Sequence, residues 1–160
     1  MIWQMRRLFG LACLLVLAAC GPFCGSFSLS NPGVDASHSC PEGAVQQPYQ
    51  VHATVAADNP TSQQVTIKSA TADMVVASVH GRWEQAVGAK YDAGQVPVTP
   101  AKVGPSSKTT LILTIPSACS NSNTSGTADN YADYTVDFTI VTSAGTFKLT
   151  SQNKHRIVAP

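Results

Sequence analysis

The feature that most limits how this 160-residue chain can fold is a strict alternation of apolar and polar side chains in several short segments. From Tyr49 to Ala57 every second residue is apolar, and the same period of two recurs over residues 64–69, 109–115 and 134–140. Side chains alternate between two faces along a β-strand, so this period predicts strands with one buried face. No segment after the first 19 residues has the apolar stripe of a helix. The sequence therefore predicts an all-β domain.

Turn and breaker residues divide this pattern into separate strands. Residues 74–79 are apolar on both faces, which predicts a central strand. Pro116 is expected to end the strand at 109–115, because proline cannot donate to a sheet ladder. Ser143-Ala144-Gly145 predicts the turn of a hairpin between residues 134–140 and a strand that contains Phe147 and Leu149. Ile157 and Val158 are expected to form the last strand.

The first 19 residues have the pattern of a cleaved export signal. Arg6 and Arg7 precede twelve residues without charge, Leu8 to Ala19, and small residues lead up to Cys20. A basic start, a short apolar run and a small-residue cleavage site are typical of a secretory signal peptide. The apolar run is shorter than the roughly 20 residues that a membrane-spanning helix needs. We therefore predict that residues 1–19 are a signal peptide.

The sequence Leu17-Ala18-Ala19-Cys20 resembles the lipobox of bacterial lipoproteins. That resemblance implies cleavage before Cys20 and a diacylglycerol on its thiol, through which the protein is anchored to a membrane. It places the protein in the bacterial cell envelope, facing the periplasm or the exterior. Gly21 resembles the outer-membrane sorting pattern of cells with two membranes. The alternatives are an ordinary signal peptide, in which Cys20 is incidental, and a twin-arginine signal, which Arg6 and Arg7 partly match.

Residues 20–47 are rich in Gly, Pro and Ser without a sustained period, which predicts a flexible tether before a single domain at 48–160. Within this tether, Phe27 and Leu29 either pack on the domain or lie near the lipid surface. Without the leader the chain has eight basic and nine acidic residues. A chain with so small a net charge has no positive electrostatic field to attract nucleic acid. Membrane contact would depend on the lipid on Cys20.

Many short strands separated by turns favour a two-sheet sandwich. The turn Asn59-Pro60-Thr61, the segment 104–111 and the closing hairpin are similar to those of immunoglobulin-like domains. This resemblance covers about residues 47–160 and implies a single immunoglobulin-like sandwich. The Cys…Trp…Cys spacing of antibody domains is absent, because Cys40 precedes the first clear strand. An inter-sheet disulfide of the antibody kind is therefore not expected.

Three cysteines remain after Cys13 and Cys20 are set aside, in a compartment that permits disulfides. Cys24 lies only four residues after Cys20, within the predicted tether. Cys40 and Cys119 each border a predicted strand region, so we expect these two to form the disulfide. Three free or differently paired thiols are the alternative.

Residues 81–108 are the irregular part of the domain, with short strands expected near 86–91 and 96–98. Loops on a rigid sandwich often carry function, and aromatic side chains dominate interface energetics. Trp83 and Tyr91 in this segment are therefore candidates for a binding surface. Packing in the core is the competing interpretation for both.

The remaining polar residues indicate no catalytic or metal site. His38, His52, His80 and His155 match no zinc spacing, and His38 lies two residues before Cys40, which is assigned to the disulfide. Asp129, Asp133 and Asp137 recur at a spacing of four, and Asp133 and Asp137 are interpreted as solubilising charges on the outer face of a strand rather than as a calcium site. No nucleophile motif is present. We predict no enzyme activity and no cofactor.

The sequence thus predicts a lipid-anchored envelope protein with a non-enzymatic binding or structural module, whose partner is another envelope protein or a polymer. The alternative is an envelope lipoprotein that binds a small ligand or a metal.

Overall fold

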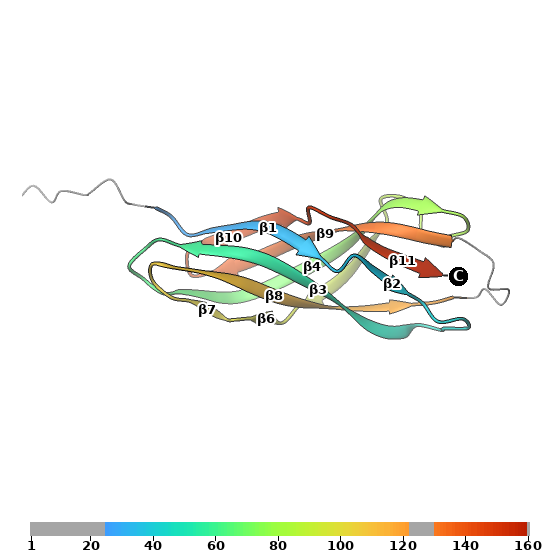
Figure 1. The fold of residues 1–160 in the computed structure, drawn as a ribbon, viewed down its shortest axis with the longest axis horizontal. Coiled ribbons are helices and arrows are strands. Elements are labelled where there is room, and N and C mark those ends of the chain that lie inside the picture. Colours follow the sequence, from blue (N-terminus) through green and yellow to red (C-terminus); the bar gives the residue numbers. More distant parts are fainter. Residues whose placement is uncertain (1–24, 122–129, 160) are drawn as a thin grey trace, which may run out of the picture.

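The computed structural model describes residues 25–121 and 130–159, and within them every regular element is a β-strand. The strands are β1 (Ser28–Val34), β2 (Ser37–Ser39), β3 (Gln47–Asn59), β4 (Val65–His80), β5 (Lys90–Gln95), β6 (Val98–Thr99), β7 (Lys102–Val103), β8 (Ser107–Cys119), β9 (Asn130–Thr142), β10 (Gly145–Thr150) and β11 (His155–Ala159). One sheet has the order β1-β3-β8-β6 and the other β2-β11-β9-β4-β5, with β10 on β9 and β7 on β4. The predicted all-β, two-sheet sandwich is confirmed (Figure 1).

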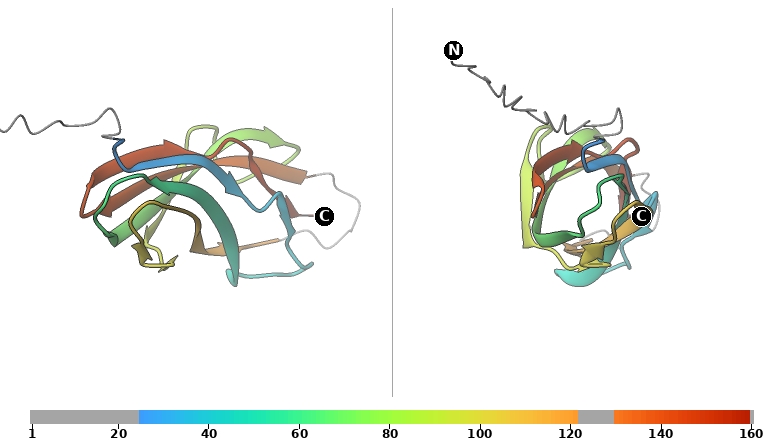
Figure 2. Two further views of the ribbon diagram at one scale, coloured as in Figure 1. Left: turned by 60° about the vertical axis from the view of Figure 1, so that its left-hand side comes forward. Right: turned by 90° about the vertical axis from the view of Figure 1, so that its left-hand side faces the viewer.

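The core lies between the two sheets, which curve around a common interior when viewed from one end (Figure 2). Its largest fully buried side chain is that of Phe138 on β9, which is 1% exposed. Phe27 and Phe147 meet edge to face with their ring centroids 5.5 Å apart. This contact closes one side of the sandwich, because Phe27 leads into β1 of one sheet and Phe147 belongs to β10 of the other.

The predicted tether is wrong over most of its length. Residues 28–34 form β1, which pairs with β3, and residues 37–39 form β2, which pairs in parallel with β11. The domain therefore begins near Phe27 rather than at residue 48. A bulge between Ser30 and Gly33, with Asn31 at a φ of 50°, breaks the period of two and hides β1 from pattern analysis.

Pro116 does not end β8 as predicted, because the strand continues to Cys119. The backbone N–H of Thr114 donates to the carbonyl of Pro97, just before β6. Alternate residues of a strand direct their N–H groups to the same side, so the nitrogen of Pro116 faces the side where β6 no longer follows β8. Proline at position 116 therefore removes no hydrogen bond between paired strands.

Two further differences concern strand boundaries. The predicted strands at 64–69 and 74–79 are one long strand, β4, which bends at two bulges and lies between β9 and β5 as a central strand. The short strands of the irregular segment are β5, β6 and β7, shifted from the predicted positions. The predicted hairpin of β9 and β10 is present, with Ile140 opposite Phe147 and Phe138 opposite Leu149.

The two ends of the sandwich differ in what they hold. Gly25, the first described residue, lies against Pro60 in the turn after β3. At the opposite end β8 finishes, and β2 leads into the loop before β3 (Figure 1). Among the described residues no helix is long and apolar enough to cross a membrane.

Candidate functional site

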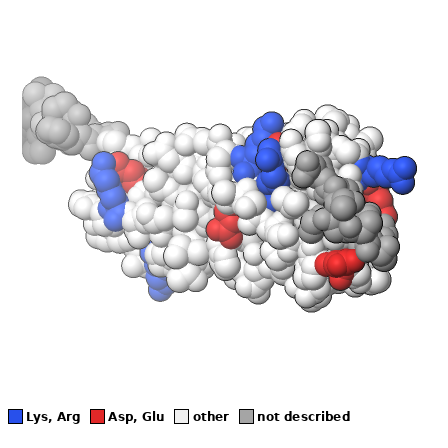
Figure 3. Space-filling model, turned by 45° about the vertical axis from the view of Figure 1, so that its right-hand side comes forward, with Lys and Arg blue, Asp and Glu red and all other residues white. Residues whose placement is uncertain are grey.

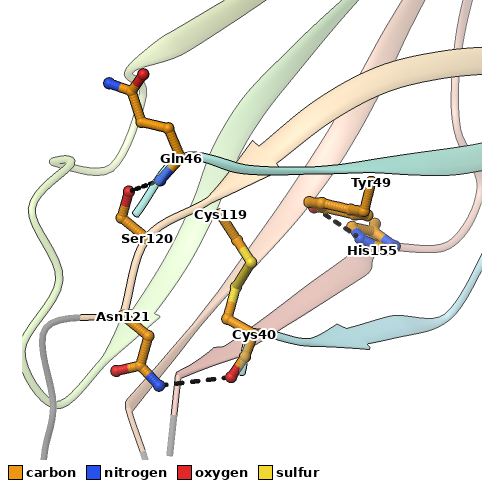
Figure 4. Close-up of a disulfide and its surroundings, with 7 residues drawn as sticks. All are labelled: Cys40, Gln46, Tyr49, Cys119, Ser120, Asn121 and His155. Atoms are coloured by element: carbon orange, nitrogen blue, oxygen red, sulfur yellow. Dashed lines mark hydrogen bonds between the residues drawn. A yellow bond between two sulfur atoms is a disulfide. The ribbon is translucent and has the colours of Figure 1, made fainter. Parts of the chain in front are cut away.

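A disulfide joins the two sheets at the end of the sandwich away from Gly25 (Figure 4). Cys40 follows β2 of the larger sheet and Cys119 is the last residue of β8 in the smaller one. Both side chains are buried, and their Cα atoms are 5.9 Å apart. The predicted pairing is thus the one in the structure, whereas Cys20 and Cys24 lie outside the described residues.

Hydrogen bonds hold the loop after Cys40 on the end of β8. The backbone N–H of Asn121 donates to the carbonyl of Ala44 at 2.8 Å, and its side-chain amide donates to the carbonyl of Cys40 at 3.4 Å. The backbone N–H of Gln46 donates to Ser120 Oγ at 3.0 Å (Figure 4). Residues 40–46 and 119–121 therefore form one connected structure around the disulfide.

A partly buried series of polar side chains, His155, Tyr49 and His38, lies beside the disulfide (Figure 4). His155, which is 1% exposed, lies with its Nδ1 2.8 Å from the carbonyl oxygen of Asp35, so Nδ1 carries the proton and donates. Its Nε2 then accepts from the Tyr49 hydroxyl at 3.3 Å. The Tyr49 ring in turn stacks on the ring of His38, with centroids 3.8 Å apart. Both nitrogens of His155 are thus satisfied in the neutral form.

Burial is the main cause of the pKa shifts of Tyr49 and His155. It raises the pKa of Tyr49 to about 12, against a smaller opposing effect of its hydrogen bond to Ser117. It lowers the pKa of His155, and the nearby His38 acts in the same direction, while the carbonyl and charge of Asp35 oppose it. At neutral pH Tyr49 is protonated and donates, and His155 is neutral and accepts.

This arrangement predicts that the domain loses stability in mild acid. Because the folded-state pKa of His155 is below its unfolded value near 6.5, the unfolded chain binds more protons as the pH falls below about 6.5. The contribution of neutral His155 is therefore complete above that pH and declines below it, by at most about 1.4 kcal/mol per pH unit. Urea unfolding at pH 7.5 and 5.0 should show a smaller drop in His155→Gln than in wild type. His80→Gln, which changes an exposed histidine, should keep the wild-type drop, and equal drops in all three proteins would contradict the assignment.

A second feature of the same end is a cavity of about 340 Å³. The segment between β4 and β5, the end of β8 and the start of β9 form its walls. Trp83 and Tyr134 supply its aromatic part, and Gln85, Asn121 and Asn130 contribute amide side chains. Arg82 and Glu84 also line it and are exposed. The lining is therefore mixed, with one large indole among groups that can donate and accept hydrogen bonds.

Hydrogen bonds fix the aromatic wall of this cavity. Trp83 Nε1 donates to the Tyr134 hydroxyl at 3.1 Å, and that hydroxyl donates to Gln85 Oε1 at 2.9 Å. The backbone N–H of Arg82 donates to Asn130 Oδ1 at 2.7 Å, which holds the irregular segment on the start of β9. Burial raises the pKa of Tyr134, while its hydrogen bond from Trp83 acts in the opposite direction. The hydroxyl therefore remains a donor at neutral pH.

The structure separates the two aromatic residues that the sequence singles out. Trp83 is half-buried, packs against the core and lines the cavity, so the core interpretation holds in part and its role in binding stays a prediction. Tyr91 lies on the edge strand β5 opposite the buried Met74, is 39% exposed and does not line the cavity. Tyr134, Tyr49 and His155 were not predicted as site residues. Their only signal was a hydroxyl or imidazole within strands whose other inward-facing side chains are mostly apolar.

Charged groups elsewhere are dispersed. On the face shown in Figure 3, small separate groups of acidic and basic side chains lie among uncharged residues. Asp133 accepts from Arg156 Nε at 2.7 Å and from Ser78 Oγ at 3.0 Å, and Arg156 lies over the Tyr131 ring. Asp137 accepts from Thr150 Oγ1 at 2.7 Å. Both carboxylates thus have local partners, while Asp129 lies outside the described residues.

One group of side chains has the composition of a metal site. The ligand atoms of His38, Cys40 and Cys119 all lie within 4.8 Å of one another, with both cysteines buried and the histidine half-buried. The spacing of these residues in the sequence predicts no metal site, because Cys119 comes from a distant strand. In the disulfide form both sulfur atoms are bonded to each other.

Comparison with known proteins gives the fold no specific family. No protein-family model and no curated protein matches the chain. Among solved structures it is similar to the ASH/PapD-like domain 7 of human CEP192, at 10% identity over 96% of this chain and 98% of that one, with a TM-score of 0.32. It is also similar to a putative late embryogenesis abundant protein, at 18% identity over 83% and 72% of the two chains and a TM-score of 0.42. The Vibrio cholerae protease VesB matches at 9% identity over 81% and 32%, with a TM-score of 0.28. Likenesses at this level indicate no function for this chain.

Proposed function

We propose that the protein is a lipid-anchored component of the bacterial cell envelope whose β-sandwich is a non-enzymatic binding module. The observation that carries the proposal is the cavity beside Trp83, formed at the end of the sandwich opposite the first described residue. Its partner is another envelope protein or an envelope polymer. Sequence supports the anchor, through the lipobox-like Leu17-Ala18-Ala19-Cys20, and the geometry supports the place of binding.

The relative positions of the lipid anchor and the cavity favour a role in binding a partner that lies beyond the anchoring membrane. Only four residues separate Cys20 from Gly25, so a lipid on Cys20 would hold the adjacent end of the domain within about 17 Å of the membrane surface. Because the strands run along the long axis of the molecule (Figure 1), the end of the domain that holds the cavity would then be the one further from that membrane. A binding surface in this position is accessible to a partner that is not itself in the same membrane.

The chemistry of the cavity suits recognition by packing and hydrogen bonding. An indole offers a large apolar surface, and amides both donate and accept. The Trp83–Tyr134–Gln85 hydrogen bonds hold this wall in place before a ligand arrives, which reduces the entropic cost of binding. The proposal of a non-enzymatic role rests on this predominance of amide, hydroxyl and indole groups.

A small-ligand carrier is the second candidate. A volume of about 340 Å³ lies at the lower end of the roughly 300–1,000 Å³ typical of small-molecule sites. The two functions differ in the size of what is bound, so the same capture experiment distinguishes them.

The experiment has two arms, anchoring and capture. Wild-type protein should fractionate with membranes and carry lipid on Cys20 in intact-mass measurements, whereas Cys20→Ser should be released to the aqueous fraction. An unmodified Cys20, or cleavage elsewhere, would contradict the anchor. In cross-linking from native membranes, Trp83→Ala and Glu84→Lys, which reverses a charge in the cavity lining, should each reduce capture of the partner at least tenfold.

Tyr91→Ala is the matched control, because it removes an exposed aromatic side chain that does not line the cavity. Capture should remain at the wild-type level in this variant. Equal capture by all three variants would contradict the cavity as the binding site. Capture of a small molecule alone, lost in the Trp83 and Glu84 variants, would favour the carrier function.

A further inference from the structure

Three metal-ligating side chains meet at the disulfide end, although they come from opposite sheets. His38 lies on β2, Cys40 follows two residues later, and Cys119 ends β8. Residues two apart in extended chain project to the same side, which brings His38 next to Cys40. The disulfide then places Cys119 beside both, so that all three ligand atoms lie within 4.8 Å of one another.

The histidine of this group is oriented before any metal binds. Its ring stacks on Tyr49 with centroids 3.8 Å apart and an interplanar angle of only 4°. The neighbouring His155 is engaged at both nitrogens, by the carbonyl of Asp35 and the Tyr49 hydroxyl. Of these two histidines, His38 is therefore the one whose ring is placed to bind a metal together with the two sulfur atoms.

We propose that the reduced protein binds one zinc ion through His38, Cys40 and Cys119. Two sulfurs and one imidazole nitrogen are the ligands that Zn²⁺ prefers, and three protein ligands leave a fourth position for water. This inference goes beyond the proposed function, because it requires neither the lipid on Cys20 nor the cavity beside Trp83.

The exchange between the two states balances with a dithiol as reductant. The dithiol supplies two electrons and two protons, the Cys40–Cys119 bond breaks to give two thiols, and the reductant becomes a disulfide. Zinc then binds the two thiolates, and the two thiol protons are released to solvent. Cys40 and Cys119 would thus be linked in both states, by the disulfide in the oxidised protein and by the zinc ion in the reduced protein.

The test uses the chain from residue 20 onward with Cys20→Ser and Cys24→Ser, so that Cys40 and Cys119 are its only thiols. This chain includes all the strands found in residues 25–121 and 130–159. It is reduced with a phosphine under argon and titrated with Zn²⁺ in competition with a chromophoric chelator. We expect one zinc per reduced chain, and no comparable binding by the oxidised chain.

Two histidine variants separate this site from adventitious binding. His38→Ala should weaken zinc binding of the reduced chain at least tenfold. His80→Ala should leave it unchanged, since His80 also stacks on a tyrosine, Tyr131, but is not part of the sulfur cluster. Binding by His38→Ala at wild-type affinity would overturn the proposal, because the two thiols alone would then account for it.

Loss of structure on reduction would also be informative. The reduced chain is tested by its near-ultraviolet circular dichroism. If that signal is lost on reduction, free zinc at a hundred times its dissociation constant should restore the native spectrum, because a ligand that binds only the folded state stabilises that state. Cobalt substitution should give the sulfur-to-metal absorption band of thiolate ligands. A folded reduced chain without zinc binding, or an unfolded one that zinc does not restore, would overturn the proposal.

Discussion

Replacing Phe138 with alanine is expected to lower the free energy of unfolding by about 3–5 kcal/mol. The phenyl ring is 1% exposed and is the largest fully buried side chain of the core, on the central strand β9. Its neighbours across the sheet are Ala72 on β4 and Leu149 on β10. Truncation leaves a cavity that these flanking strands cannot fill without breaking their register, so the loss should lie at the upper end for a core residue. Urea unfolding monitored by circular dichroism measures it.

Asp137→Ala is the matched control, one position away on the same strand. Its side chain points to the outer face, where it accepts a hydrogen bond from Thr150 and lies directly opposite Asp73. The bond is lost on substitution, but so is the repulsion between two carboxylates paired across strands. The net change should therefore stay within about 0.5 kcal/mol. Equal losses at Phe138 and Asp137 would mean that the aspartate belongs to a network or ligand site on that face.

Removal of the disulfide should have an effect of similar size. The Cys40→Ala/Cys119→Ala double variant is expected to lose about 2–5 kcal/mol, with chain entropy giving up to about 4.5 kcal/mol for a ring of this length. The two cysteines are 79 residues apart, and the bridge joins the two sheets. Cys24→Ser, the control, should leave stability unchanged.

Peptide mapping without reduction provides the independent check. It should find Cys40 and Cys119 in one linked pair of peptides, with Cys24 elsewhere. A Cys24–Cys40 link would contradict the pairing in the structure. A double variant as stable as wild type would show that packing alone holds the end of β8 against the loop after β2.

The sequence predicts the strands whose side chains alternate without interruption. β3 and β9 appear where the period of two is regular, because one face of each is covered by the opposite sheet and the other is open to polar groups. β1 was missed, since its bulge at Ser30–Gly33 shifts the register and its proline and glycine resemble a linker. β2 has only three residues, and only its pairing with the distant β11 makes it a strand.

The candidate sites were only partly predictable for a related reason. Trp83 and the two disulfide cysteines were identified because each is a rare residue type at a recognisable position. The partners of these residues come from other strands: Tyr134 from β9 for Trp83, and His38 from β2 for Cys119. Such convergence depends on which strands are neighbours and how they are registered. Local sequence patterns do not contain that information.

The placement of the disulfide has a mechanical consequence. If the protein is held at Cys20 and pulled by a partner at the far end, the tension acts along the strands, so that paired strands are sheared rather than unzipped. Several hydrogen bonds between β1 and β3 must then fail together. Beyond Cys40 the covalent bridge links the loop after β2 directly to Cys119, so a load applied at the end of β8 bypasses the chain between the two cysteines. Under such a load the chain outside the bridge extends first, while the chain enclosed by the bridge keeps its fold.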